Sequence, residues 1–387
     1  MPSLINNKRN LVLIGLIFLL SSTINSVLGL HLSGHQEPIT AQAYQHQFNA
    51  QNAYQHIGTQ LDFGYRVPGY TAHDQCADWI RNQMESKTEQ VITHQFTKDG
   101  IECENILAKI NIQKSNIVIL GAHWDSRAVA EKDPDPENQD DPIPGANDGA
   151  SGVAVLIELA RIFETIKVNI SCQVWFLFLD AEDQGESLGV YGIDGWSWCE
   201  GSRAFNNVID QYYDGPAETI ESFVLLDMVG GTNLQFIRES GYTDDDLYDQ
   251  IWFVGRDLGY TTEFPSDYAS YRIIDDHVYF HQNGIPAADL IIDFSSGNPR
   301  WNHHHRQTDD LSNIAQSSLD ATGKTMESYF NVFYNSEAPP PNYPNNTGGW
   351  ETWQYILVIG GGTVAVVAIG ISILNKIQMK KLLPAQD

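Results

Sequence analysis

Basic residues and cysteines are scarce in this chain of 387 residues, and each scarcity excludes a class of protein. Lys and Arg number 22 against 49 Asp and Glu, so the formal net charge is −27. Such a chain repels phosphate backbones, which argues against nucleic acid as a partner. Four Cys are too few for a disulfide scaffold, and the absence of a CxxC pair argues against a thiolate zinc site. Hydrophobic residues make up 42%, a composition typical of a folded protein.

The start of the sequence has the pattern of a secretory signal. Lys8 and Arg9 precede an apolar run at 11–20, and residues of small or modest size end the segment at Gly29. A charged start, a short apolar run and such a cleavage region are typical of a signal peptide, here residues 1–29. The apolar run is short for a membrane span, which favours cleavage over an uncleaved anchor or a core helix.

A second apolar segment, residues 355–374, is expected to cross the membrane. It has no charged residue, it is long enough for a hydrocarbon core of ~30 Å, and Lys376, Lys380 and Lys381 follow it. We therefore expect a single-pass protein of the cell membrane whose main domain is extracellular and whose C-terminus is cytoplasmic. The expected order is signal peptide, outward-facing domain, Pro- and Gly-rich linker, transmembrane helix and cytoplasmic tail (1–29, 30–335, 336–354, 355–374 and 375–387).

The four cysteines could form two disulfides if the chain is exported, because secreted compartments are oxidising. Cys76 with Cys103 and Cys172 with Cys199 are the expected pairs, since the members of each pair are close in sequence. Four Cys allow three connectivities, and Cys172, which lies in an apolar run, could equally be a buried free thiol.

Helical and strand patterns alternate through residues 30–335. The runs expected as strands are continuously apolar, which indicates strands buried on both faces between layers of helices. Two of them, joined by the short polar segment 113–116, have the pattern of a hairpin. Helices are expected at 41–57, 72–84 and 148–163, and strands at 106–112, 117–122, 172–179, 222–228 and 287–292.

Side chains able to bind a metal follow several of these strands. His123 and Asp125 come after one strand, Glu182 and Asp183 after another, and Asp227 ends a third. In folds of this kind ligands collect at the carboxyl ends of the strands, so these side chains are expected to converge. Imidazole and carboxylate without thiolate are the ligands of catalytic rather than structural zinc. The same edge is expected to receive Asp148, before a helix, and the loop residues His303, His304 and His305.

Each of these residues has an ordinary explanation when it is taken alone. Asp148 could be a helix N-cap, a His after a strand could be solvated, and Glu182 with Asp183 could form an exposed turn. Their common placement at strand ends of one polarity favours a shared site instead. The acidic run 131–141 lacks the spacing of a calcium loop and is interpreted as a solvated loop.

Six segments, in order, resemble the motif series of metallopeptidase family 28, which joins zinc aminopeptidases to animal-type glutaminyl cyclases. They cover nearly all of the expected outward-facing domain. The resemblance implies a three-layer α/β/α sandwich around a mixed, mostly parallel sheet of about eight strands. The segments are AHWDSR (122–127), PGANDGASGVA (144–154), LDAED (179–183), LLDMVG (225–230), DDH (275–277) and HRQTDDL (305–311).

The resemblance also implies a ligand set for zinc. Asp148 would bridge two zinc sites, and Asp183 and His305 would complete the first of them. His123 and Asp227 would hold a second zinc in the peptidase branch of the family. In the cyclase branch one zinc usually suffices, so the resemblance allows one zinc ion or two.

Two further residues match positions that act on the ligands or the substrate. Asp125, two residues after His123, resembles a carboxylate that holds the imidazole in one orientation. Glu182, beside a ligand but not itself one, resembles the general base and acid of the reaction.

The sequence departs from the family pattern in the metal-binding motifs. Asp183 stands where a second Glu is common, so one expected ligand is a methylene shorter. Arg306 stands where a Thr is expected. Three successive His leave the position of one ligand open, and the spacing to Thr308 and Asp309 favours His305.

Smaller features favour the cyclase branch, especially its bacterial secreted members. They are HWDSR with a long acidic loop, WCEGS after DAED, and DDH where peptidases more often have SDH. In that branch Asp276 and Asp227 would form a carboxylate network that holds the proton of Glu182. Trp301 would pack on the substrate near the metal, with a core or surface aromatic as the alternative.

The sequence therefore predicts an extracellular zinc enzyme that acts on the amino termini of peptides or proteins. Pyroglutamate formation from an amino-terminal glutamine, with release of ammonia, is the first hypothesis. A zinc aminopeptidase that hydrolyses amino-terminal residues is the alternative. A third, from another class, is a non-catalytic domain that keeps the fold.

Overall fold

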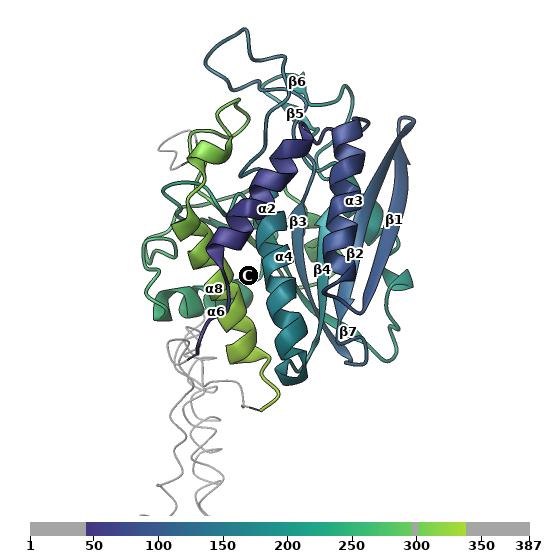
Figure 1. Cartoon of the computed structure of the whole chain (residues 1–387), viewed down its shortest axis with the longest axis vertical. Helices are drawn as coiled ribbons and strands as arrows, with labels where there is room; N and C mark the ends of the chain where they lie inside the picture. Colours follow the sequence, from purple (N-terminus) through teal and green to yellow (C-terminus); the bar gives the residue numbers. More distant parts are fainter. Residues whose placement is uncertain (1–43, 296–300, 338–387) are drawn as a thin grey trace, which may run out of the picture. The chain divides into compact units, whose positions relative to one another are not determined.

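The computed structural model describes residues 44–295 and 301–337 of the chain (Figure 1). Within these two ranges no helix is both long enough and apolar enough to cross a membrane. The expected signal peptide, transmembrane helix and cytoplasmic tail, and nearly all of the expected linker, lie outside the described residues.

A mixed sheet of six strands forms the centre of the described part, in the order β1-β2-β4-β3-β7-β10. β4, β3, β7 and β10 are parallel neighbours, whereas β1 and β2 pair in the antiparallel sense. The strands are β1 (Gln90–Lys98), β2 (Ile101–Ile110), β3 (Asn116–His123), β4 (Gln173–Leu179), β7 (Thr219–Asp227) and β10 (Ala287–Ile291).

The expected number of eight strands is wrong for this sheet. The other strands of the described residues are only two residues long, and they form two separate ribbons instead of extending the sheet. These are β5 (Glu186–Ser187) with β6 (Val190–Tyr191), and β8 (Arg238–Glu239) with β9 (Ser270–Tyr271).

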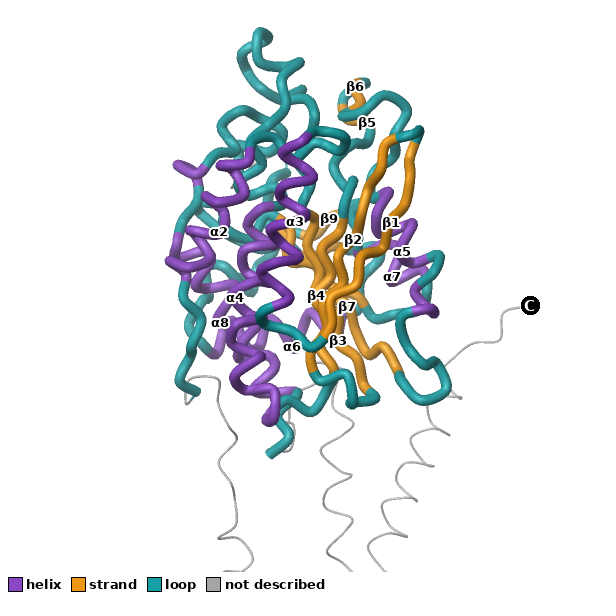
Figure 2. The backbone as a smooth tube through the Cα atoms, turned by 45° about the vertical axis from the view of Figure 1, so that its right-hand side comes forward, coloured by secondary structure: helices purple, strands orange, loops and turns teal. Residues whose placement is uncertain are grey.

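Helices cover both faces of the sheet and complete three layers, as expected (Figure 2). The helices of one face are α2 (Ala50–Phe63), α3 (Thr71–Glu85), α4 (Ala150–Ile166), α6 (Asp245–Asp257) and α8 (Gln316–Phe333); those of the other are α5 (Glu200–Asn206) and α7 (His277–Gln282). Short 3₁₀ turns are η2 (Lys167–Asn169), η3 (Ile209–Gln211) and η4 (Leu311–Asn313). All seven residues of β4 are buried, as the continuous apolar run predicted.

Two predicted helices are confirmed, and the third begins later than predicted. α3 and α4 lie where helices were expected at 72–84 and 148–163. The expected helix 41–57 begins only at Ala50, because the Asn49 side chain caps it by accepting hydrogen bonds from the backbone N–H of Gln51 and Asn52.

The predicted hairpin between 106–112 and 117–122 is wrong. β4 lies between β2 and β3 and pairs with both, so the five-residue connection crosses over β4. The hairpin of this sheet is β1–β2, which turns at Asp99 and Gly100 with φ of 51° and 85°. A two-residue Asp-Gly turn in the left-handed region matches the twist of the flanking strands, and it was the hairpin signal in the sequence.

The expected disulfides are wrong, because all four cysteines are buried free thiols. Cys172 precedes β4, whereas Cys199 donates its backbone N–H to Glu182, beyond the other end of this strand. Because β4 has seven residues, the two cysteines are separated along the strand direction by roughly 20 Å, at about 3.3 Å per residue. Cys103 and the next residue, Glu104, point to opposite faces of β2; Glu104 pairs with Arg81 of α3, so Cys103 faces away from the helix that carries Cys76.

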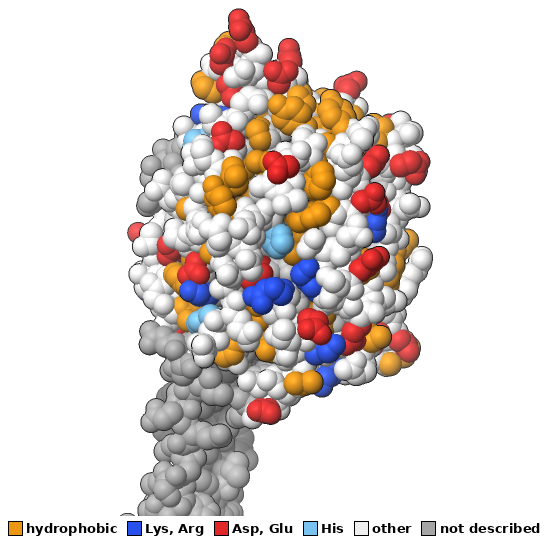
Figure 3. Space-filling model, in the orientation of Figure 1, with side chains coloured by type: hydrophobic (Ala, Val, Ile, Leu, Met, Phe, Trp, Pro, Cys, Tyr) orange, Lys and Arg blue, Asp and Glu red, His pale blue; other side chains and the backbone are white. Residues whose placement is uncertain are grey.

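The surface reflects the composition of the chain. Acidic side chains gather at the upper end of the face drawn in Figure 3, and most of the visible Lys and Arg side chains lie lower on it. The excess of acidic residues is therefore partly carried by the exposed surface, where water solvates the charges.

Candidate metal centre and active site

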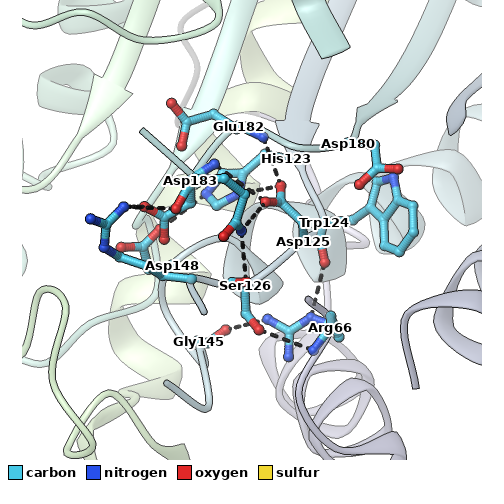
Figure 4. A network of polar contacts seen from close by, with 12 residues as sticks. Arg66, His123, Trp124, Asp125, Ser126, Gly145, Asp148, Asp180, Glu182 and Asp183 are labelled. Carbon is cyan, nitrogen blue, oxygen red and sulfur yellow. Dashed lines mark hydrogen bonds and ion pairs between the residues drawn. The ribbon is translucent and has the colours of Figure 1, made fainter. Parts of the chain in front are cut away.

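The carboxyl ends of the parallel strands bring the predicted residues together. His123 is the last residue of β3, Asp227 is the last of β7, and Glu182 and Asp183 follow β4. Asp148 joins them from the loop before α4 (Figure 4). Because β3, β4 and β7 are parallel, these ends lie at one edge of the sheet, as the sequence predicted.

One group of possible ligands surrounds His123. Its Nε2 lies 3.1 Å from Asp148 Oδ1 and 3.2 Å from Asp227 Oδ1, and all three side chains are buried. Burial disfavours the imidazolium, but the hydrogen bonds that the ring donates to Asp125, Asp148 and Asp227 outweigh it and raise the pKa of His123 well above its usual value. The group is thus held together by strong charge pairing around one imidazole.

A second group surrounds His305. Its Nε2 lies 3.2 Å from Asp183 Oδ1, and its Nδ1 contacts the Glu131 carboxylate on the other side of the ring. Asp183 Oδ2 is buried and has no hydrogen-bond partner among the described residues. Burial, together with the charge of Asp148, raises the pKa of Asp183.

Asp148 belongs to both groups. The ligand atoms of His123, Asp148 and Asp227 lie within 4.8 Å of one another, and so do those of Asp148, His304 and His305. Imidazole and carboxylate donors, with one buried carboxylate oxygen unpaired, are the chemistry of a zinc site that reacts with substrate. The residues present therefore fit zinc, with Asp148 placed between two possible positions.

Three buried side chains hold the possible ligands in place. Asp125 Oδ1 lies 3.4 Å from His123 Nδ1 and accepts the backbone N–H of Glu182 at 3.0 Å, so one carboxylate orients two segments of the site. Asp309 accepts the N–H groups of Asn147 at 2.8 Å and Asp148 at 3.1 Å. The guanidinium of Arg66 donates to the carbonyls of Trp124, Pro144 and Gly145, which ties the loop before α4 to the end of β3 (Figure 4).

Glycine is required where α4 begins beside the site. A Cβ at Gly149 would collide with the backbone and ring of His123. A Cβ at Gly152 would collide with the carbonyl oxygen of Leu226 in β7. The glycines of the motif at 144–154 thus let the helix approach β3 and β7 closely enough to place Asp148 against His123.

Several residues of the site have left-handed backbone conformations that side chains disfavour. The φ angles are 56° at Ala181, 48° at Met228 and 56° at His305. Ala181 precedes Glu182, and Met228 follows Asp227. Such strained positions cluster at functional sites, where the surrounding packing holds them.

The prediction of a solvated loop at 131–141 is only partly right, because 134–137 and 140–141 are exposed but two acidic residues are not. Glu131 and Asp133 are buried. Glu131 contacts His305 and accepts a hydrogen bond from Arg127 Nε at 2.7 Å, while Asp133 accepts the N–H of Gln307 at 3.0 Å. Sequence reasoning missed Glu131 as a partner of the predicted ligand His305. A metal-binding His often pairs its other ring nitrogen with a carboxylate, so a partner of this kind was the signal to look for.

Glu182 lies beside the ligand groups in a pocket of about 340 Å³. The Cys199 thiol donates to Glu182 Oε1 at 3.1 Å. Burial, together with the charge of Asp275, raises the pKa of Glu182 well above its usual value. Asp275 lines the pocket, whereas the predicted network residue Asp276 is fully buried beside it and does not line the pocket.

Trp301 does not line the pocket, so the structure favours its alternative interpretation as a core aromatic. Its side chain is 1% exposed, and its ring centroid lies 4.7 Å from that of His303. The aromatic side chains that line the pocket are Trp198, Tyr271 and Phe294. Trp198 stacks on the ring of His305 at 5.9 Å between centroids.

The sheet, the donors at its carboxyl edge and the buried acid beside them define a metal-dependent α/β enzyme. The model of the family described as Peptidase family M28 matches residues 105–330. The chain belongs to this family, whose peptidases depend on zinc.

Relatives of both kinds expected from the motifs are similar to this chain. The glutaminyl cyclase of Bacteroides thetaiotaomicron, solved with N-acetylhistamine, is 30% identical with a TM-score of 0.68 and covers 74% of this chain and 99% of its own. A Zn-dependent exopeptidase from Parabacteroides distasonis is 33% identical with a TM-score of 0.66, over 73% and 98%. Aminopeptidase YwaD of Bacillus subtilis is 25% identical over 55% of this chain, which spans only 40% of that relative.

Proposed function

We propose that this protein is a glutaminyl-peptide cyclotransferase that converts amino-terminal glutamine to pyroglutamate. The observation that supports this best is the position of Glu182, a buried acid that lines the pocket beside Asp183. Its carboxylate is grouped with Cys199 and Asp275 and not with the ligand atoms around His123 or His305. The expected signal peptide and membrane helix would place the site outside the cell, on the cell surface.

Each of the three sequence features that favour the cyclase branch supplies a residue that lines the pocket or contacts a side chain that does. The acidic loop supplies Glu131, which contacts His305. The WCEGS segment supplies Cys199, whose thiol donates to Glu182. The DDH segment supplies Asp275, which lines the pocket and whose charge acts on Glu182.

In the proposed reaction the α-amine attacks the γ-amide carbon of the same residue, and the bond from this carbon to the amide nitrogen breaks. Zinc, held by Asp148, Asp183 and His305, would polarise the γ-amide carbonyl and stabilise negative charge on its oxygen. Glu182 accepts a proton from the attacking amine and returns it to the departing ammonia. Asp125 holds the backbone of Glu182 and so fixes the position of this acid.

The alternative is a zinc aminopeptidase, and one observation favours it. His123, Asp148 and Asp227 form a second group of possible ligands, which supplies what a two-zinc peptidase needs. Glu182 would then take its proton from the attacking water instead of the substrate amine.

Turnover of two substrates separates the two activities. The purified full chain is incubated with a peptide that begins with Gln and, separately, with leucine 4-nitroanilide, while ammonia and 4-nitroaniline are measured. We expect ammonia from the Gln peptide and little 4-nitroaniline. The reverse result would establish the aminopeptidase, and no turnover of either substrate by zinc-loaded protein would favour a non-catalytic domain.

His123→Ala tests how many zinc ions the pocket needs. We expect the variant to keep the zinc content of the wild type and to lose activity, because His123 acts by pairing with Asp148 and Asp227 rather than by holding the catalytic ion. Elemental analysis with parallel rate measurement checks this. Loss of one zinc per chain together with all activity would instead indicate a second essential ion and move the assignment toward the peptidase.

A further inference from the structure

A second group of buried polar side chains adjoins the pocket, to whose lining it contributes Asp275, and its members come from different segments. Asp275 precedes α7, His277 begins this helix, Asp289 lies in the middle of β10, and Glu239 ends β8. His277 and Asp289 are fully buried, and Asp275 and Glu239 are each 3% exposed. His277, Asp289 and Glu239 have no part in the reaction proposed above.

Several atoms of this group lack a hydrogen-bond partner within residues 44–295 and 301–337. They are both ring nitrogens of His277, both carboxylate oxygens of Asp289 and Oδ2 of Asp275. Buried polar groups in proteins are nearly always paired, so unpaired atoms gathered in one place require an explanation. The ligand atoms of Asp275, His277 and Asp289 also lie within 4.8 Å of one another.

The distances fit a shared ion better than direct hydrogen bonds. His277 Nδ1 lies 3.7 Å from Asp289 Oδ2, beyond the usual hydrogen-bond range of about 2.7–3.2 Å. Two ligands that are each about 2.1 Å from one zinc ion in tetrahedral geometry are separated by roughly 3.4 Å. Glu239 Oε2 lies 3.6 Å from His277 Nε2, likewise beyond hydrogen-bond range, on the side of the ring where a metal-binding imidazole commonly has a carboxylate.

The chemistry of the side chains in the group also favours a cation. The Glu239 carboxylate accepts the N–H groups of Gly241 and Tyr242, each at 2.7 Å, which fixes its position beside the His277 ring. Asp289 and Asp275 add two further carboxylates. Three buried carboxyl groups around one imidazole form a donor set that suits a divalent cation.

From this geometry we infer that Asp275, His277 and Asp289 bind a divalent metal ion, zinc or manganese, separate from any metal held by Asp148, Asp183 and His305. Mixed imidazole and carboxylate ligands suit both ions. The ion would join β10 to the loop before α7, and Glu239 would orient His277. Its charge would stabilise the carboxylates that lie behind Glu182 and Asp227.

Metal analysis of variants tests this site. The full chain, His277→Gln and Asp289→Asn are purified from medium that contains zinc and manganese, and their metals are counted by plasma mass spectrometry. Each variant should contain one divalent ion per chain fewer than the wild type. His281→Gln is the matched control, because it makes the same substitution one turn later on α7 at a partly exposed residue outside the group, and it should keep the wild-type content.

A double variant shows whether the two metal sites are separate. His305→Ala should remove an ion from the pocket, and combined with His277→Gln it should remove one more. Equal metal content in the wild type, His277→Gln and Asp289→Asn would overturn the inference. If these variants fail to fold by circular dichroism, anomalous diffraction from wild-type crystals decides: a metal peak among Asp275, His277 and Asp289 supports the site, and a map without one contradicts it.

Discussion

Glu182→Gln should leave the metal content unchanged and lower turnover by at least ~10²-fold, the contribution typical of a positioned acid or base. The amide keeps the size of the side chain but cannot accept and return a proton. The neighbouring Asp183, by contrast, keeps its contact with His305. The measurement is the rate of ammonia release from a Gln peptide, with zinc determined on the same sample.

Glu186→Gln is the matched control for this variant. Glu186 lines the same pocket, but it lies on the exposed strand β5, and its carboxylate accepts the N–H of Gly189. The same chemical change at this position should alter the rate by only a few-fold, since a surface substitution removes no proton carrier. Wild-type activity in zinc-loaded Glu182→Gln would remove Glu182 from the mechanism and leave the proton transfer to another group.

The positions of the buried strands and the convergence of the site residues could be predicted from sequence. Residues 174–179 of β4 and 223–226 of β7 are apolar without interruption, and this pattern arises because helices cover both faces of a parallel sheet. Once the strands are parallel, the residues that follow them must meet at one edge, so His123, Asp183 and Asp227 could be grouped before their contacts were known.

The order of the strands could not be predicted in the same way. Periodicity shows that a strand is buried but not which strand it pairs with. The segment 111–115 between β2 and β3 is short enough for a hairpin, yet β4 comes from more than fifty residues later and occupies the position between them. β4 is buried on both faces and pairs with a strand on each edge, and this tertiary packing outweighs the local signal.

The side chains that contact the possible ligands could not be predicted from the sequence either. Glu131 stands in a run of similar acidic residues, and nothing in composition separates it from the exposed Asp140. Only the fold brings it against His305, from 174 positions away. The disulfide prediction failed for a related reason, because closeness in sequence says nothing about which face of a strand a cysteine occupies.

Among three successive histidines, His305→Ala should cause the largest loss of zinc, and with it most of the activity. His305 is buried with Nε2 at 3.2 Å from Asp183 and Nδ1 against Glu131, so both nitrogens already point to the groups expected of a ligand. His304 lies farther away, with Nε2 at 3.9 Å from Asp148 Oδ2 and Nδ1 at 2.8 Å from Lys132 Nζ.

His303→Ala is the control, because His303 is partly exposed and its Nδ1 pairs with Thr308 Oγ1 at 2.8 Å, outside the ligand groups. Zinc occupancy should therefore follow the order wild type and His303→Ala, then His304→Ala, then His305→Ala. Elemental analysis after dialysis against a weak chelator gives this order directly. Equal zinc occupancy in all three variants would exclude the loop as a source of ligands. The largest loss of zinc in His304→Ala would instead make His304 the ligand, and Glu131 and His305 would then only support the pocket wall.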